Sequence, residues 1–266
     1  MAKAARAEGL AREIVAVGRR RESLEPALDD GAVDRITADI AEGVAGSDFC
    51  VLATPVATLA SLLPEVWRAA PDDAVLTDVG STKAAIVRTA ETLGRSRPLA
   101  FIGGHPMAGS GQSGYGAARA DLFKGALVIL TPTGSSAPPA LTRVSEFWET
   151  LGARVTTLDP ATHDRAIAAV SHLPHLVADA LVDAVFRMDP RFLDVAAAGF
   201  KDTTRIAASN AQVWREIFQE NREALGEALG AFRRALDDLE RLITGGDAAL
   251  VERELDRIKR MRERLS

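Results

Sequence analysis

The stretch FCVLATPVATLASLLPEVWRAAPDDAVLTDVGSTKAAIVRTAETL (49–93) decides the fold. Its short apolar runs at 49–53 and 74–78 predict buried strands, and the segments 56–70 and 82–93 that follow them have helical spacing. A strand, a helix and a second strand in this order predict a right-handed crossover between parallel strands. Because the runs are continuously apolar rather than alternating, we expect strands that are covered on both faces.

The same alternation extends over residues 1–158. It predicts a further helix at Pro139–Leu151 and further strands at Glu13–Val17, Leu99–Ile102, Ala126–Leu130 and Arg154–Leu158. From Asp159 onward the pattern is helical only, beginning with a long helix at Pro160–Val185 that Pro174 should kink. We therefore predict an α/β domain with a mostly parallel sheet at 1–158 and an all-helical domain at 159–266.

Composition narrows the classes of protein. Asp and Glu number 37 against 32 Lys and Arg, and this net charge of −5 argues against nucleic-acid binding by charge. The single cysteine, Cys50, excludes an intrachain disulfide and a cysteine-cluster metal site. No apolar run approaches the ~20 residues that span a bilayer, and the charged start MAKAARAEGLAREIV (1–15) is unlike a signal peptide. We expect a cytoplasmic protein with no membrane partner.

A histidine follows the predicted strand at 99–102, in the sequence IGGHPMAGS (102–110). Ligands of parallel sheets bind beyond the carboxyl ends of the strands, where His105 could exchange a proton near neutral pH. The glycines around it, Gly103, Gly104 and Gly109, would let a ligand approach the backbone closely. The alternative is a glycine-rich turn in which the histidine is incidental.

A second strand end, DVGSTK (78–83), runs into a predicted helix. Ser81 or Thr82 could cap that helix, and Ser81 could instead serve a site in the cleft.

Two motifs in the helical half carry polar side chains. His172 and His175 in SHLPH (171–175) share a helix face, which favours a polar patch lining a cleft or a solvated face. We predict no metal site, because no third ligand is evident. Arg205 in GFKDTTRIA (199–207) could clamp a carboxylate with its planar fork, or form a surface salt bridge with Asp202.

The last helices carry an apolar seam at spacings of four and three, of the kind that pairs helices. Its members are Leu225, Leu229, Phe232, Leu236, Leu239 and Ile243, and a final amphipathic helix follows Gly245-Gly246. The seam is either an intramolecular bundle core or a dimer interface, and we expect a homodimer through these C-terminal helices.

Taken together and in order, six motifs resemble those of the prephenate/arogenate dehydrogenase family of tyrosine biosynthesis. They are VLATPV (51–56), DVGSTK (78–83), GGHPMAGS (103–110), SGYGAARADLFKG (113–125), SHLPH (171–175) and GFKDTTRIA (199–207) with Trp214. The resemblance implies a Rossmann-like dinucleotide-binding domain at 1–158, a helical substrate and dimerisation domain at 159–266, and NAD or NADP as cofactor.

The resemblance also implies an oxidative decarboxylation of prephenate or arogenate. The ring carbon bearing the hydroxyl gives a hydride to the nicotinamide, the hydroxyl proton goes to a base, and the ring carboxylate leaves as carbon dioxide. The matching residues would be His105 as base, Ser81 beside it and the nicotinamide, Arg205 on a substrate carboxylate, His175, His172 and Trp214 at the side-chain end of the pocket, and Thr54 and Pro55 beside the cofactor ribose. A β-hydroxy acid dehydrogenase would instead place a lysine on the long helix, and Pro160–Val185 contains none.

The chain departs from the family at its start. Members open with a strand and a G-x-G-x-x-G turn that seats the pyrophosphate, whereas this sequence begins inside the helix that should follow. We expect the sheet to lack that first strand, with an exposed edge or a gap. Either the native protein is longer, or this is a shortened, cofactor-poor homologue that binds a ligand or pairs with another subunit.

A second departure concerns the choice of cofactor. The predicted strand at 13–17 ends in Gly18, Arg19 and Arg20, where users of NAD often carry an acidic residue. Arg19 could meet a 2′-phosphate, which favours NADP; the alternative is a solvated turn.

Overall fold

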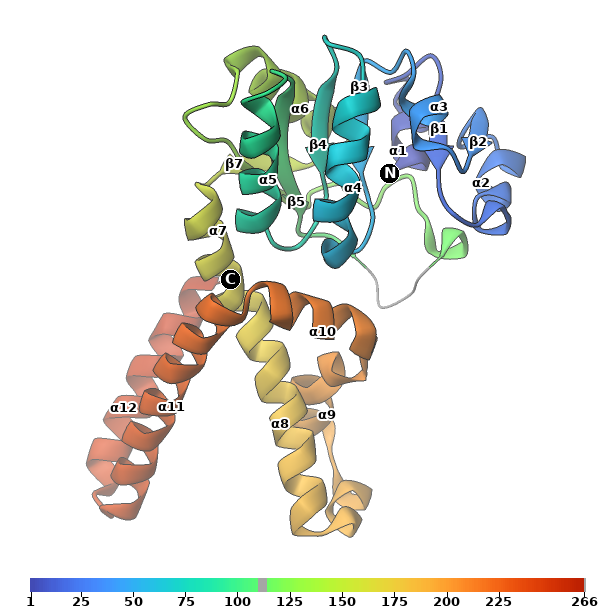
Figure 1. Ribbon diagram of the computed structural model, residues 1–266. Helices are drawn as coiled ribbons and strands as arrows, with labels where there is room; N and C mark the ends of the chain where they lie inside the picture. Colours follow the sequence, from blue (N-terminus) through green and yellow to red (C-terminus); the bar gives the residue numbers. More distant parts are fainter. Residues whose placement is uncertain (110–113, 266) are drawn as a thin grey trace.

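The computed structural model describes residues 1–109 and 114–265. Its larger sheet has five strands in the order β3-β4-β5-β6-β7, and every neighbouring pair is parallel except β5 and β6. The strands are β3 (Phe49–Leu52), β4 (Val75–Asp78), β5 (Ala100–Pro106), β6 (Leu127–Thr131) and β7 (Arg154–Thr157). The predicted mostly parallel sheet is confirmed (Figure 1).

Helices cover both faces of this sheet. On one face lie α4 (Val56–Ala69) and α5 (Ala84–Gly94), and the apolar stripe of α4 packs Leu59, Leu63 and Trp67 onto buried residues of β4 and α5. On the other face, α6 (Pro138–Thr150) and the short α1 (Ala2–Ala7) form a second core with β4, β5 and β6. Burial on both sides explains why the strands are continuously apolar.

A separate two-stranded sheet precedes β3. Its strands β1 (Val15–Val17) and β2 (Arg35–Thr37) pair in parallel, beside α2 (Glu25–Asp29) and α3 (Ile40–Val44). In the described part of the chain, β1 pairs only with β2 and β3 only with β4, so the expected interruption of the sheet is present. We did not predict β2, because three residues are too short to show a period.

The helical half begins with one nearly continuous run. α7 (Pro160–Ile167) passes through a π-helical turn, Ala168–His172, into α8 (Leu173–Met188). The predicted long helix is present and ends at Met188. Pro174 lies in the first turn of α8, where its missing N–H is tolerated, and the interruption takes the form of the widened turn before it.

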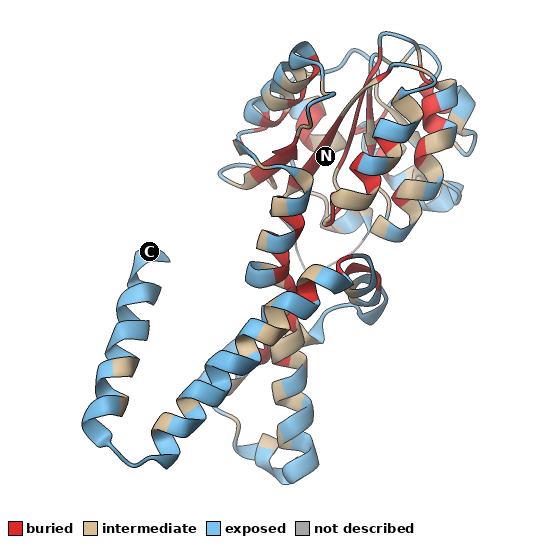
Figure 2. Ribbon diagram, turned by 60° about the vertical axis from the view of Figure 1, so that its left-hand side comes forward, coloured by how far each residue is buried: buried red, intermediate tan, exposed pale blue. Residues whose placement is uncertain are grey.

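Four more α-helices follow in the described part of the chain. They are α9 (Ala198–Thr204), α10 (Ala211–Glu220), α11 (Arg222–Thr244) and α12 (Ala248–Arg262). Figure 1 shows α8 with α9, and α11 with α12, as two legs that extend away from the α/β domain. Figure 2 shows both legs to be mostly exposed.

Exposed apolar residues mark both legs. Leu225 is buried, but Leu236 is 53% and Ile243 67% exposed, so the seam of α11 is not the core of an intramolecular bundle. The run Pro160–Met188 is long and apolar enough to cross a membrane, with 17% of its most apolar window buried. Length and composition alone are weak evidence for a membrane span. Contact with a protein partner would equally explain why Phe186 and Met188 on this run are exposed.

Candidate functional site

The conformation of His105 follows from an extended β5. This strand continues to Pro106, four residues past the predicted end, because Gly103–Pro106 pairs antiparallel with Val128–Thr131 of β6. His105 lies near the carboxyl end of the strand and is 8% exposed. Its Nδ1 is 2.9 Å from Nε2 of His163, a residue of α7. The imidazole is therefore held where the two halves of the chain meet.

The glycines before His105 serve the sheet rather than a ligand. A Cβ on Gly103 would lie 2.4 Å from Oγ1 of Thr131, and one on Gly104 would lie 2.7 Å from the carbonyl oxygen of Asp78. Our expectation that they let a ligand approach is wrong for these two positions, because protein atoms already occupy that space.

His105 is neutral at neutral pH. Burial is the largest cause that lowers its pKa well below the ordinary value of a histidine, followed by electrostatic interactions with His163, Lys83 and His172, which disfavour a second positive charge. A neutral imidazole can accept a proton, which is the property that a general base needs.

A buried ion pair supports the backbone before His105. Lys83 and Asp78, both 0% exposed, pair with each other, and Lys83 Nζ also donates to the carbonyl oxygen of Gly104 at 2.9 Å. Asp78 accepts from the backbone N–H groups of Gly80 at 2.8 Å and Gly104 at 3.2 Å. Burial lowers the pKa of Lys83, and the Asp78 carboxylate opposes that shift. We did not predict this pair, although both residues lie in the DVGSTK motif.

The cap of α5 comes from the helical half of the chain. Asp164 of α7 accepts hydrogen bonds from the backbone N–H groups of Lys83 at 2.8 Å and Ala84 at 2.9 Å. The expectation that Ser81 or Thr82 caps this helix is wrong. Burial raises the pKa of Asp164, but its hydrogen bonds from His163, Ala84 and Lys83 outweigh burial and leave the pKa below the ordinary value.

Ser81 lies between β4 and α5, at the same sheet edge as His105. Adjacent strands β4 and β5 pair Thr77 with Ile102, so both residues follow that pair by a few positions. Ser81 is half-buried, and no hydrogen bond of its side chain is found within the described residues. Its role beside the base stays a prediction.

The histidines of the helical half meet the predicted tryptophan. His175 stacks on Trp214 with ring centroids 3.5 Å apart, and His172 meets the same ring edge-on at 6.1 Å. Burial lowers the pKa of His172 to about 4, so this side chain is neutral as well. Asn221, at the start of α11, lies 3.2 Å from His172 Nδ1 through its amide nitrogen.

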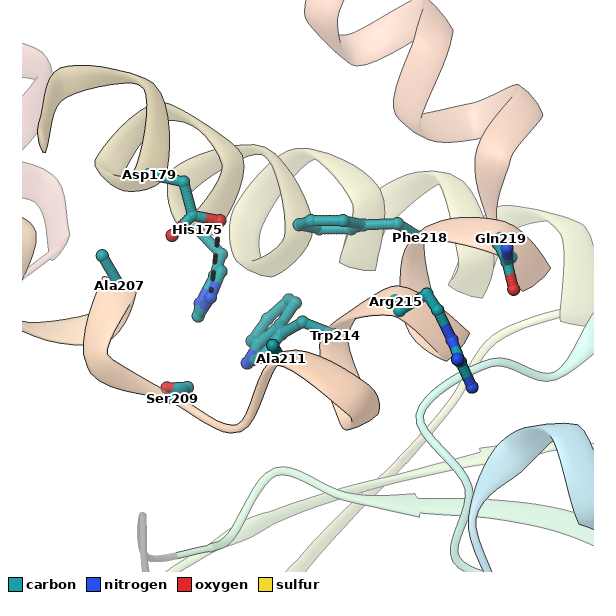
Figure 3. A pocket seen from close by; sticks show the side chains of 9 residues that line it. All are labelled: His175, Asp179, Ala207, Ser209, Ala211, Trp214, Arg215, Phe218 and Gln219. Atoms are coloured by element: carbon teal, nitrogen blue, oxygen red, sulfur yellow. Dashed lines mark ion pairs between the residues drawn. The ribbon is translucent and has the colours of Figure 1, made fainter. Parts of the chain in front are cut away.

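His175 and Trp214 line a pocket of about 520 Å³ (Figure 3). Nδ1 of His175 is buried without a hydrogen-bond partner in the described structure, and its Nε2 lies 3.8 Å from Asp179. The other lining residues are Asp179, Ala207, Ser209, Ala211, Arg215, Phe218 and Gln219. The volume suits a small organic molecule.

Arg205 begins the turn Arg205–Ala208, which leads directly into the pocket wall at Ala207. Its side chain is exposed, and no ion pair joins it to Asp202 among the residues described. The surface salt bridge is therefore absent here, and the guanidinium is available to an anion.

The residues predicted to hold the cofactor lie at strand ends of the α/β domain. Pro55 is the N-cap of α4, directly after β3, and Oγ1 of the preceding Thr54 is buried without a partner among the described residues. Arg19 lines a second pocket of about 560 Å³ after β1, with Gly18, Arg20, Ser23 and Leu24. An unsatisfied hydroxyl and a basic pocket fit the ribose and phosphate of a dinucleotide.

Two family models together match most of the chain. Residues 1–157 match the nucleotide-binding domain of prephenate dehydrogenase, and residues 159–258 match its dimerization domain. The chain belongs to the prephenate dehydrogenase family. Two of the six motifs are described only in part, because Ser110 at the end of GGHPMAGS and Ser113 at the start of SGYGAARADLFKG lie outside the described residues.

Three curated relatives define its place in the family. It is 32% identical to prephenate dehydrogenase of Lactococcus lactis subsp. cremoris over 94% of this chain and 70% of the relative. It is also 32% identical to the prephenate dehydrogenase of Bacillus subtilis, over 89% of this chain and 65% of the relative. The chain thus spans about two thirds of the length of these two relatives. It is 30% identical to the cyclohexadienyl dehydrogenase of Zymomonas mobilis over 80% of this chain and 74% of the relative.

Solved structures of the family share the whole fold. The prephenate dehydrogenase of Aquifex aeolicus in complex with hydroxyphenyl propionate and NAD+ superposes with a TM-score of 0.93 at 36% identity, covering 100% of this chain and 93% of that one. The arogenate dehydrogenase of Synechocystis gives 0.87 at 30% identity, covering 100% and 95%. The family is one of oxidoreductases, and the matched nucleotide-binding domain supports use of NAD(P).

Proposed function

We propose that this chain is an NAD(P)-dependent prephenate dehydrogenase, which oxidatively decarboxylates prephenate to 4-hydroxyphenylpyruvate. The observation that carries the proposal is a buried, neutral His105 at the carboxyl edge of a dinucleotide-binding sheet, held against the helical half that contains the pocket. Family membership and the named relatives support the same activity.

His105 accepts the proton of the substrate hydroxyl. As the O–H bond breaks, its electron pair forms the ring carbonyl and the C–H bond of the same carbon gives up a hydride, which the nicotinamide would accept when bound. The C–C bond to the ring carboxylate then breaks and carbon dioxide leaves. The electron pair of that bond makes the ring aromatic and moves to the carbonyl oxygen, which takes up a proton to become the phenol. Placing a general base at the hydroxyl typically accelerates such a step 10²–10⁴-fold, and Ser81 at the same sheet edge is proposed to orient the base.

The helical half binds the rest of the substrate. Arg205 is proposed to hold a substrate carboxylate with two parallel hydrogen bonds, which its exposed and unpaired guanidinium allows in the described structure. His175 and Trp214, with His172 behind them, form the wall for the side-chain end.

One observation favours arogenate as a second substrate. Asp179 lines the pocket beside His175 and would attract the side-chain ammonium of arogenate, which prephenate lacks. We expect Asp179→Asn to lower kcat/KM for arogenate more than for prephenate. Equal effects on both substrates would remove this reason to include arogenate.

Thr54, Pro55, Ser81 and Arg19 are proposed to hold the cofactor, and Arg19 to favour NADP. The basic pocket after β1 contains Arg19, Arg20 and Ser23 and has Gly18 where an acidic residue would bind the ribose of NAD. The ratio of kcat/KM for the two cofactors tests this, with Arg19→Gln as the matched variant. A strong preference for NAD+, unchanged in the variant, would contradict it.

The chain is proposed to form a homodimer through its C-terminal helices. The exposed seam of α11 and the exposed apolar residues of α8 and α12 support this, together with the matched dimerization domain. The absence of nucleic-acid or membrane partners and a cytoplasmic location remain predictions.

The test is the absorbance of reduced nicotinamide with prephenate and with arogenate, each against both cofactors. Prephenate-dependent reduction that requires His105 is expected. If no reduction is seen, the cofactor and prephenate are each titrated alone against the chain. A chain that binds neither of them saturably is not the proposed enzyme.

A further inference from the structure

A second histidine and an aspartate lie behind His105. His163 is 0% exposed, with Nε2 2.9 Å from Nδ1 of His105 and Nδ1 2.8 Å from Oδ1 of Asp164. The three side chains form an unbroken line from β5 into α7, and the rings of the two histidines meet edge-on at 5.1 Å. Neither His163 nor Asp164 belongs to the residues assigned to substrate or cofactor above.

Hydrogen-bond directions fix the protons in this line. An ionised carboxylate only accepts, so Nδ1 of His163 must donate to Asp164. In the neutral form of His163 this is the ring's one N–H group, so its Nε2 is then an acceptor. Nδ1 of His105 must then donate to it, and the lone pair of His105 is left on Nε2.

We propose that His163 and Asp164 are positioning residues that hold His105 in the tautomer whose Nε2 takes the proton of the substrate. The substrate in this statement rests on the proposed function, whereas the tautomer does not. When His105 is protonated on Nε2, its Nδ1–H keeps the same acceptor, so the change needs no rearrangement of the line.

Asp164 links this arrangement to the contact between the two halves of the chain. Its carboxylate also accepts from the N–H groups of Lys83 and Ala84, and its carbonyl oxygen accepts from Asn221 at 2.8 Å. The carboxylate is thus held by the start of α5, and the main-chain carbonyl of Asp164 is held by Asn221, the residue before α11. The tautomer of His105 is consequently set only while α7 lies against the start of α5.

Nitrogen-15 NMR of the full chain tests the tautomer directly. The sequence has four histidines, so single His→Gln variants assign every ring. The wild-type chain should show a protonated Nδ1 and an unprotonated Nε2 in His105, with a scalar coupling across the hydrogen bond to Nε2 of His163. Protonation of Nε2 instead of Nδ1 in His105 would overturn the proposal without any variant or activity measurement.

Two substitutions of His163 then separate positioning from structure. Gln offers a carbonyl oxygen to Nδ1 of His105, whereas Leu offers no acceptor. We expect His163→Leu to lower kcat about 10²–10⁴-fold with little change in KM, and His163→Gln to recover a large part of that loss. The control Ile167→Ala removes buried side chain from the same helix without touching the line and should keep kcat.

Equal kcat values in the wild type and His163→Leu, with an unchanged tautomer, would refute the positioning role. If the wild type reduces no cofactor with prephenate or arogenate, the proposed function fails, while the NMR result still decides the tautomer.

Discussion

Replacing His105 by Asn tests the chemistry most directly. The substitution removes the proton acceptor but leaves a polar side chain facing His163. General-base catalysis is typically worth 10²–10⁴-fold, which corresponds to about 2.7–5.4 kcal/mol of the activation barrier. The substitution leaves the residues that are proposed to bind the substrate unchanged: His175 on α8, Trp214 on α10 and Arg205 in the turn before α10. We therefore expect kcat to fall by that factor and KM to stay within a few-fold.

The pH profile makes this prediction specific to His105. Burial, and after it electrostatic interactions with His163 and Lys83, lower its pKa well below 6.5, so protonation stops the wild-type enzyme only at acidic pH. The kcat/KM should be level through neutral pH and fall as the pH drops through that lowered pKa. His105→Asn should lose this acid limb. Turnover near the wild-type value, or an acid limb that survives the substitution, would refute the assignment of the base.

Three further outcomes follow from the structure. Lys83→Met leaves the Asp78 carboxylate buried without its partner charge, which should destabilise the protein by about 3–5 kcal/mol. The double variant Lys83→Met/Asp78→Asn should recover part of the lost stability. Urea unfolding measures the stability of both variants, and a single variant as stable as the wild type would contradict the stabilising role of the pair. The pKa of His172 is lowered from 6.5 to about 4 in the folded protein, so the unfolded chain binds the proton more tightly. The free energy of unfolding should therefore fall by up to roughly 3 kcal/mol as the pH drops from 6.5 to about 4. His172→Gln should make this pH dependence shallower, and an equally steep dependence in the variant would mean that another group takes up the proton. Leu236→Asp, which puts a charge on the exposed seam, should shift sedimentation toward the monomer, with the exposed Glu240→Asp as control; an unchanged dimer would place the interface elsewhere.

The sequence predicted what periodicity and local spacing encode. The apolar runs of β3 and β4 and the stripe of α4 appear within a residue or two of their expected bounds, because burial on a sheet face requires that pattern. The short β2 was missed because Ile36 is its only buried residue and three positions carry no period.

The site was predictable only where residues near in sequence act together. His172 and His175 are three positions apart and share a helix face, and their meeting with Trp214 was expected from the family resemblance. His163, in contrast, lies 58 positions from His105, and Asp164 lies 81 from Lys83. Nothing in the local sequence around Asp164 shows that it caps α5, since the contact exists only after the halves pack. The glycines before His105 were misinterpreted for the same reason, because the atoms that crowd them belong to other strands.

The unpartnered legs have a consequence for how this protein responds to dilution. α11 has 23 residues, roughly 35 Å of helix, yet Leu225 is its only buried residue, and α12 has none in the described structure. Helices without a packed face are marginal in water. A protomer separated from its partner should therefore fray from its C-terminal end while the sheet stays intact, and helical circular dichroism should fall at concentrations where the assembly dissociates.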